Sequence, residues 1–215
     1  MKTTEESGLE MEIVAVIDFE TTGLSPAMGD RATEIAVVLV QNGQVIRRYQ
    51  SLMNAGVKIP RHIQALTGIT NNMIEDAPSA TAVMREVSDF VEDFPLVAHN
   101  AAFDKRFWDA ELARLPRTTR NRFACSMLIA RRVLPQAPSH KLGELVAFAK
   151  LPVTGKFHRA QADAEMTASL LTYMQDQLQQ RYKIDRVSHD LWCRIQKASA
   201  AGVAKCVAEH LAGHS

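Results

Sequence analysis

Two acidic residues stand at the end of the first apolar run of the chain. Asp18 and Glu20 follow the β-branched stretch that begins at Ile13, and only Phe19 separates them. Side chains two positions apart in a strand project from the same face, so both carboxylates point one way while Phe19 points into the core. The simpler alternative is a solvated strand end before the turn at 21–24, and the spacing alone does not choose between the two.

Two further acids, Asp104 and Asp163, are expected in the first turns of helices that begin near Ala102 and Ala160. An acid at this position often only complements the helix dipole. However, strand ends and the helices that leave them meet at one edge of an open α/β sheet, and ligands bind at that edge. We therefore expect the four acids to converge there.

Four carboxylates in one partly buried cleft cannot all stay ionised without cations. All-oxygen ligands select hard ions, so the expected cofactors are two divalent cations, Mg²⁺ or Mn²⁺, bound by Asp18, Glu20, Asp104 and Asp163. Two such ions about 4 Å apart are the usual device for in-line displacement at phosphorus. His158 lies just before Asp163 and is a candidate general base for the attacking water, because histidine changes charge near neutral pH. An exposed or capping histidine is the alternative.

These side chains need a sheet and helices that position them. The strands predicted from apolar runs are 13–18, 34–40, 45–52, 96–98 and 122–125. The helices predicted from helical spacing are 81–94, 102–115, 127–133, 141–150 and 160–180. The pair Asn42-Gly43 joins the second and third strands and is a strong hairpin signal. The order of elements predicts an α/β protein with a mixed sheet, antiparallel in its first three strands and then parallel, flanked by helices.

The composition fits one globular catalytic domain. The chain has 215 residues, of which 47% are hydrophobic and 23% charged. We divide it into a flexible N-terminus over 1–11, a catalytic domain over 12–180 and a helical tail or partner-binding appendage over 181–215. The longest apolar runs, such as 35–40, are far shorter than the ~20 residues that span a bilayer, so neither a signal peptide nor a membrane helix is expected. Three widely spaced cysteines predict reduced thiols and a cytoplasmic location.

Three blocks resemble the motifs of the DEDDh 3′→5′ exonucleases, the DnaQ-like group that includes the proofreading epsilon subunit of bacterial DNA polymerase III. The blocks are IDFETTGL at 17–24, HNAAFD at 99–104 and HRAQADA at 158–164. The resemblance covers 12–174 and implies an RNase H-like fold, a two-metal mechanism, the four acids as metal ligands and His158 as base. Gln161 stands where many relatives have an apolar residue, which we expect to affect packing and not chemistry.

The same resemblance implies a substrate. The candidate contacts to the terminal nucleotide are Thr21, Leu24, Asn100 and Phe103. Alternatively, Phe103 is a core residue at helical spacing, and Asn100 simply closes a turn. The implied activity releases nucleoside 5′-monophosphates from the 3′ end of single-stranded nucleic acid, with DNA favoured over RNA, as in DNA replication or repair. The chain has no segment similar to the clamp-binding pentapeptide of the proofreading subunit, which favours a free-standing enzyme or a different partner.

The near-balance of 25 basic and 24 acidic residues hides a local separation of charge. Segment 105–132 carries a net charge of +6 and could track nucleic-acid phosphates, whereas segment 75–93 carries −5. The alternative is a solvated basic face answered by the acidic segment. Two other functions stay open at this point: an RNA-trimming exoribonuclease of the same fold, and a non-catalytic scaffold that binds a polymerase or other partner through 181–215. A scaffold has no need for four uncompensated carboxylates.

Overall fold

The computed structural model describes residues 12–116, 120–155 and 157–213, so the predicted flexible N-terminus lies outside the described residues. In this part of the chain five strands form one sheet, and their bounds are β1 Ile13–Thr21, β2 Ala32–Gln41, β3 Gln44–Leu52, β4 Leu96–Ala98 and β5 Phe123–Cys125. The α-helices are α1 Arg61–Thr67, α2 Asn71–Glu75, α3 Ala80–Val91, α4 Ala102–Leu112, α5 Ser126–Val133, α6 Leu142–Phe148, α7 Ala160–Tyr182, α8 His189–Ile195 and α9 Val203–Ala212. Short 3₁₀ helices are η1 Pro26–Met28 and η2 Ala200–Gly202.

The sheet has the strand order β3-β2-β1-β4-β5. Strands β1, β2 and β3 are antiparallel neighbours, whereas β4 is parallel to β1 and β5 is parallel to β4. The hairpin turn between β2 and β3 uses Asn42 and Gly43, both at positive φ, as an Asn-Gly turn requires. This topology confirms the predicted mixed sheet.

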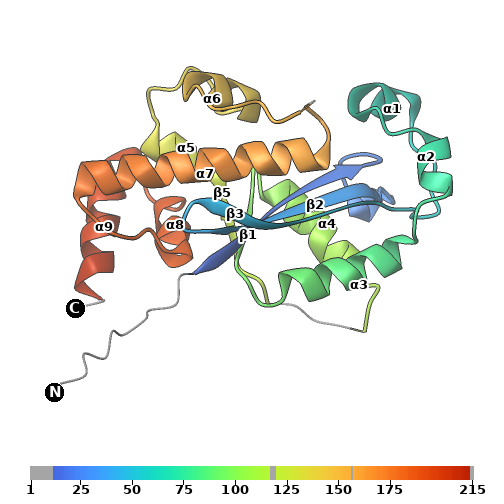
Figure 1. Ribbon diagram of the computed structural model, residues 1–215, viewed down its shortest axis with the longest axis horizontal. Coiled ribbons are helices and arrows are strands. Elements are labelled where there is room, and N and C mark those ends of the chain that lie inside the picture. The colour runs from blue at the N-terminus through green and yellow to red at the C-terminus, as the bar shows by residue number, and fades with distance from the viewer. Residues whose placement is uncertain (1–11, 117–119, 156, 214–215) are drawn as a thin grey trace.

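Helices cover both faces of the sheet (Figure 1). The side chains of β1 point alternately to the one face and to the other. On one face Val14 and Val16 of β1 pack in a core with α5, α7 and α8. On the other face Ala15, Ile17 and Phe19 pack in a second core with α3 and α4. Phe19 therefore enters the core, as its position between the two acids predicts.

Strand β1 continues to Thr21, three residues beyond the predicted end at Asp18. Pairing with β2 extends it, because Glu20 lies opposite Glu34 and Thr21 opposite Ala32, with an irregularity between the two pairs. Both acids therefore belong to a paired strand and not to a solvated turn. The backbone that carries them is fixed by a neighbour that the sequence around Asp18 does not indicate.

The short helices α1 and α2 were not predicted. They enclose a small separate cluster of Ile59, Ile69 and Ile74 beyond the end of the sheet (Figure 1). Helices of this length show less than two turns of periodicity, so the spacing of apolar residues cannot identify them.

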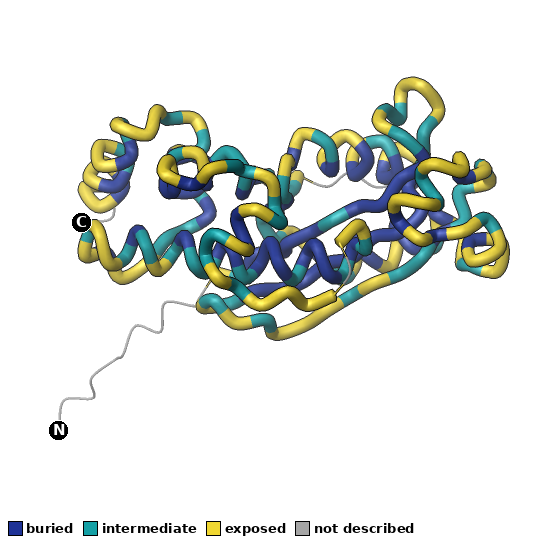
Figure 2. Tube along the Cα trace, turned by 90° about the horizontal axis from the view of Figure 1, so that it is seen from above, coloured by how far each residue is buried: buried dark blue, intermediate teal, exposed yellow. Residues whose placement is uncertain are grey.

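The C-terminal helices pack against the rest of the molecule. The Nε2 atom of His189 donates to the carbonyl oxygen of Leu96 at 3.0 Å, and the backbone N–H of Cys125 donates to the side chain of Gln196 at 2.7 Å. Trp192 is buried in the core under α7. Figure 2 shows buried residues gathered along the middle of the molecule and exposed residues around its rim. None of the described helices is both long and apolar enough to cross a membrane.

Replacement of Trp192 by Ala tests whether α8 is part of the folding unit. We expect a loss of about 3–5 kcal/mol in the free energy of unfolding, because a large buried side chain leaves a cavity in the core. Urea unfolding followed by circular dichroism measures this loss. Leu211→Ala on the exposed side of α9 is the control, with an expected change below about 0.5 kcal/mol. Equal effects of the two substitutions would contradict this role of α8.

Candidate active site

The alternation of β1 places two of the predicted acids under α7. Asp18 and Glu20 continue the series of Val14 and Val16, whose side chains face α7, and they lie at the carboxyl end of the strand. Glu20 is buried, and Asp18 is partly exposed. The strand thus presents two carboxylates to the first turn of the long helix.

Asp163 and His158 meet these acids from α7 and the loop before it. The backbone N–H of His158 donates to Oδ2 of Asp163 at 3.0 Å, which folds the loop back over the helix start. His158 has a φ of 62°, in the left-handed region that non-glycine residues seldom occupy. Ligand atoms of Glu20, His158 and Asp163 all lie within 4.8 Å of one another.

Asp104 reaches the same place from the other face of the sheet. It lies in the first turn of α4 and is 2% exposed, and its Oδ1 accepts a hydrogen bond from the backbone N–H of Phe19 at 3.2 Å. This bond joins the start of α4 to the part of β1 between Asp18 and Glu20. The four predicted acids and His158 are therefore brought to one end of the sheet.

The acids share one electrostatic environment. Burial, together with the charges of Asp104, Glu20 and Asp163, raises the pKa of Asp18 well above its ordinary value. Burial and the neighbouring acids raise the pKa of Glu20 to about 8, although Arg159 opposes this effect. Burial likewise raises the pKa of Asp104 to about 7, and it raises the pKa of Asp163. Each carboxylate is thus held where negative charge is costly without a compensating cation.

The donor set fits hard divalent cations. Oδ1 of Asp163 is buried and finds no hydrogen-bond partner among the described residues, an arrangement that a bound cation would satisfy. Carboxylate oxygens of several residues around one point are the ligands that Mg²⁺ and Mn²⁺ prefer. The residues of this site can therefore hold such ions, with His158 beside them.

The four candidate substrate contacts differ in how far they are buried. Thr21 is buried, and its hydroxyl donates to the carbonyl oxygen of Gly23 at 2.6 Å, whereas Leu24 is 75% exposed. Asn100 is exposed, has a φ of 67° and closes the turn between β4 and α4. Phe103 is half-buried, and the centroid of its ring lies 5.1 Å from the centroid of the Phe107 ring. The packing role of Phe103 and the turn-closing role of Asn100 are thus present, and neither residue is fully buried.

A cleft of about 620 Å³ lies beside His158 and Asp163. Residues from α5 and α6 line it in addition to the motif residues, and they are Met127, Lys141, Leu142, Gly143 and Glu144. The sequence predicts this helix but not its position, because α6 reaches the site through contacts distant in the chain, such as its packing against α7. Phe157 also lines the cleft. In the sequence, its position next to His158 indicates that it lies near the site.

His99 of the second block fastens that wall to the sheet. Its Nε2 lies 3.0 Å from the carbonyl oxygen of His140 and must donate, so its Nδ1 accepts from the hydroxyl of Ser126 at 2.9 Å. Burial lowers the pKa of His99 to about 4. The neutral ring thus holds the residues before α6 against the end of β4.

Two residues that the sequence reasoning missed are Glu34 and Arg159. Arg159 forms a two-pronged ion pair with Glu34, whose side chain is fully buried beside the start of α7. The available signals were an acid at the start of the otherwise apolar run 34–40 and a cation directly after His158. Gln161, the departure from the family pattern, donates to Glu165 on the same helix.

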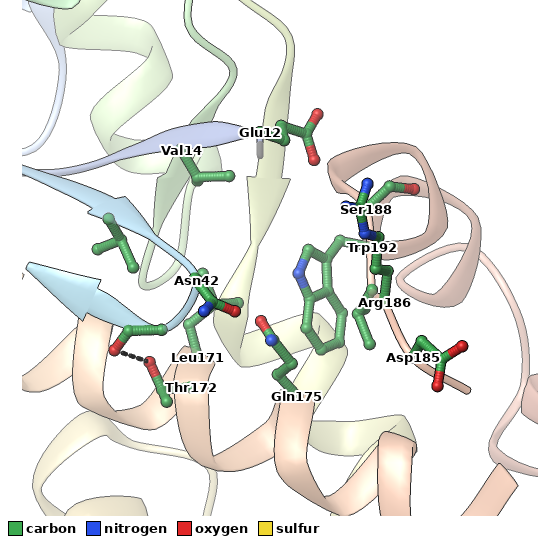
Figure 3. A pocket seen from close by; sticks show the side chains of 13 residues that line it. Glu12, Val14, Asn42, Leu171, Thr172, Gln175, Asp185, Arg186, Ser188 and Trp192 are labelled. Carbon is green, nitrogen blue, oxygen red and sulfur yellow. Dashed lines mark hydrogen bonds between the residues drawn. The ribbon is translucent and has the colours of Figure 1, made fainter. Parts of the chain in front are cut away.

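Another cavity, of about 180 Å³, lies at the opposite end of β1 (Figure 3). Val14, Leu171 and Trp192 line it, together with the β2–β3 turn. There the hydroxyl of Thr172 donates to the carbonyl oxygen of Gly43 at 3.2 Å. None of the predicted site residues lines this cavity, so it is separate from the acid cluster.

Several basic side chains of segment 105–132 form ion pairs or hydrogen bonds with neighbouring residues. Lys105 pairs with Asp109, and Arg122 pairs with Asp190 at 3.0 Å. The guanidinium of Arg132 donates to the carbonyl oxygen of Ala198 at 2.9 Å. Arg117 of this segment lies outside the described residues. These contacts favour a structural role for much of the segment over a continuous phosphate track.

The charge crowding predicts how the metal-free protein responds to pH. Because the pKa of Glu20 rises from 4.5 to about 8 on folding, the folded state binds more protons than the unfolded state within this window. This group therefore stabilises the fold at low pH, and the contribution is lost as pH rises, by at most about 1.4 kcal/mol per pH unit.

The melting temperature in chelator is measured from pH 5 to 9. We expect it to fall more steeply for the wild type than for Glu20→Gln, and we expect saturating Mg²⁺ to flatten the wild-type curve. Parallel curves for the two proteins in chelator would contradict the assigned environment of Glu20.

The exonuclease family profile matches residues 15–171. The chain is similar to the DNA polymerase III PolC-type of Bacillus subtilis, with 36% identity over 168 residues that cover 77% of this chain and 12% of the relative. It is also similar to 3′-5′ exonuclease DinG of the same organism, with 36% identity over 173 residues, 77% of this chain and 18% of the relative. A putative bifunctional exonuclease/endonuclease protein of Mycobacterium tuberculosis is 37% identical over 175 residues, 78% of this chain and 27% of the relative. The chain thus spans between about an eighth and about a quarter of these relatives.

Solved structures agree with the sequence comparison. Exonuclease X in complex with 5′ overhanging duplex DNA matches with a TM-score of 0.65 and 27% identity, covering 85% of this chain and 99% of that chain. The nuclease domain of 3′hExo, a DEDDh family member bound to rAMP, matches with a TM-score of 0.67 and 18% identity, covering 77% and 92%, which shows a shared fold. The family profile, which covers most of the chain, shows that this chain belongs to the exonuclease family, and the chain shares the fold of a solved DEDDh nuclease domain.

Proposed function

We propose that this chain is a 3′→5′ exonuclease that hydrolyses the terminal phosphodiester of single-stranded DNA and releases nucleoside 5′-monophosphates. The observation that carries this proposal is the meeting of Asp18, Glu20, Asp104 and Asp163 with His158 at one end of the sheet. The similarity to 3′-5′ exonuclease DinG supports the direction of cleavage. The 5′ overhanging duplex bound by exonuclease X supports DNA as the substrate.

The four acids are the proposed ligands for two divalent cations, Mg²⁺ or Mn²⁺. When bound, the cations would supply charge stabilisation for in-line displacement at phosphorus. Burial of Glu20 and Asp104 and the unpartnered Oδ1 of Asp163 support this role, because the side chains are already arranged to receive positive charge.

His158 is the proposed general base. Its ring stands beside Glu20 and Asp163, where it can accept a proton from the attacking water. The water oxygen bonds to phosphorus, the bond from phosphorus to the 3′ oxygen breaks, and that oxygen takes up a proton as it leaves. The products are a nucleoside 5′-monophosphate and a strand one nucleotide shorter with a 3′ hydroxyl.

Thr21, Leu24, Asn100 and Phe103 are the proposed contacts of the terminal nucleotide. Leu24 is 75% exposed and offers an apolar surface. The half-buried ring of Phe103, which also contacts Phe107 and Arg106, offers a second one. Asn100 lines the cleft beside His158. We expect these residues to hold a strand end against the acids.

A protein partner at 181–215 stays a prediction. The apolar side chains of this segment that would serve a partner are largely used within the chain, since Trp192, Ile195, Val203 and Val207 are buried in its own core. The three free cysteines support the proposed cytoplasmic location, because thiols persist in reducing compartments.

Substitutions at the proposed site test the chemistry. Replacing His158 by Gln is expected to lower kcat by about 10²- to 10⁴-fold, as loss of a general base does. Asp18→Ala together with Glu20→Ala should abolish activity, and a chelator should abolish wild-type activity reversibly. The measurement is release of label from single-stranded DNA. Activity that survives either the double substitution or the chelator would contradict the assignment.

Substrate class and direction are tested on three 5′-labelled molecules: single-stranded DNA, duplex DNA with a mismatched 3′ end, and a short RNA. We expect a ladder that shortens from the 3′ end, most rapidly on single-stranded DNA. A faster ladder on RNA would favour the exoribonuclease alternative. No cleavage of any of them in either Mg²⁺ or Mn²⁺ would contradict the proposed function and favour a scaffold.

A further inference from the structure

Glu34 is a fifth acid beside the site, and it is saturated by hydrogen bonds. Its carboxylate accepts from Nη2 and Nε of Arg159 at 2.9 and 3.2 Å. It also accepts from the backbone N–H of Ala160 at 3.1 Å and from the amide of Gln50 at 2.7 Å. The side chain of Glu34 is 0% exposed. Both oxygens are therefore engaged within the protein, which distinguishes Glu34 from an acid left open for a cation.

The groups that Glu34 holds belong to the third motif block. Arg159 directly follows His158, and Ala160 is the first residue of α7. Asp163 lies in the first turn of that helix and holds the backbone of His158. A shift of the helix start would therefore move His158 and Asp163 together.

The position of Glu34 also creates an electrostatic need. Glu34 lies directly opposite Glu20 in the β1–β2 ladder, and directly opposed like charges destabilise a sheet. Arg159 offsets this repulsion, because its guanidinium pairs with Glu34 and lowers the cost of charge on Glu20. Arg159 thus neutralises Glu34, and the other four acids are left for the proposed ions.

We propose that Glu34 is a positioning residue of the active site, which acts through Arg159 and the first N–H of α7 to place His158 and Asp163 opposite Glu20. This inference rests on the proposed function for its kinetic consequence. The predicted effect of Glu34 on metal binding is independent of the proposed function, because metal binding can be measured without substrate.

A generic buried ion pair is the alternative explanation, and the chain offers a matched control. Glu111 on α4 is 2% exposed, pairs with Arg31 at 2.7 and 2.8 Å, and accepts from the backbone N–H of Ala32 at 3.3 Å. This second pair resembles the first in burial and bonding. It joins α4 to the start of β2 and does not contact the third motif block.

The experiment compares Glu34→Gln with Glu111→Gln in the full chain. Affinity for Mn²⁺ without nucleic acid is measured by calorimetry, kcat and KM on single-stranded DNA by label release, and stability by melting temperature. We expect both substitutions to lower the melting temperature. Only Glu34→Gln should weaken Mn²⁺ affinity and lower kcat, each by about 10- to 100-fold, as loss of a supporting contact does, with KM within about threefold.

Arg159→Lys is the second variant, because its side chain is partly exposed and the substitution keeps the charge while losing the fork of two donors. We expect intermediate losses of Mn²⁺ affinity and kcat. Equal Mn²⁺ affinity and kcat for Glu34→Gln, Glu111→Gln and wild type would overturn the inference. If wild type binds Mn²⁺ but cleaves no nucleic acid, the proposed function fails, and the calorimetry still decides the role of Glu34.

Discussion

Repulsion among carboxylates at the end of β1 is the constraint on which the rest of this structure depends. Asp18, Glu20, Asp104 and Asp163 are close enough for their charges to act on one another, and burial adds to the cost of ionising them. A protein keeps such an arrangement only if positive charge offsets it or if its carboxylates become protonated. The arrangement therefore connects stability to function, since the divalent cations that would relieve the repulsion are also the ions that would act on phosphorus.

The scaffold holds these charges against their tendency to separate. The paired β1–β2 ladder fixes Glu20, and the N–H of Phe19 ties Asp104 to the strand. Two buried pairs of glutamate and arginine also join strands to helices. Arg31 with Glu111 fastens the C-terminal end of α4, away from Asp104 in its first turn, and the pair formed by Glu34 fastens the start of α7, which carries Asp163. Because removal of one partner from such a pair leaves a buried charge, each pair resists displacement of its helix.

Much of this could be predicted from the sequence, and the successes have a common physical reason. The alternation of side chains in a strand is a local property, so the common face of Asp18 and Glu20 followed from their spacing. The Asn-Gly hairpin and the placement of Asp104 and Asp163 in first turns of helices were also local. The three motif blocks identified the family because their residues are contiguous. The failures were of another kind. Helices α1 and α2 are too short to show a helical spacing of apolar residues, and β1 extends beyond its predicted end because β2 pairs with its last residues.

The sequence by itself therefore determined the identity of the acids, the strand face they share, and the family of the chain. Only the tertiary structure decided that α6 forms one wall of the cleft, that the helices beyond Lys183 pack on the core, and that Glu34 binds the start of α7. These features depend on contacts between residues far apart in the chain, such as Glu34 and Ala160. Hydrogen bonding and packing between such residues leave no spacing pattern in the sequence, because the fold alone sets which of them meet.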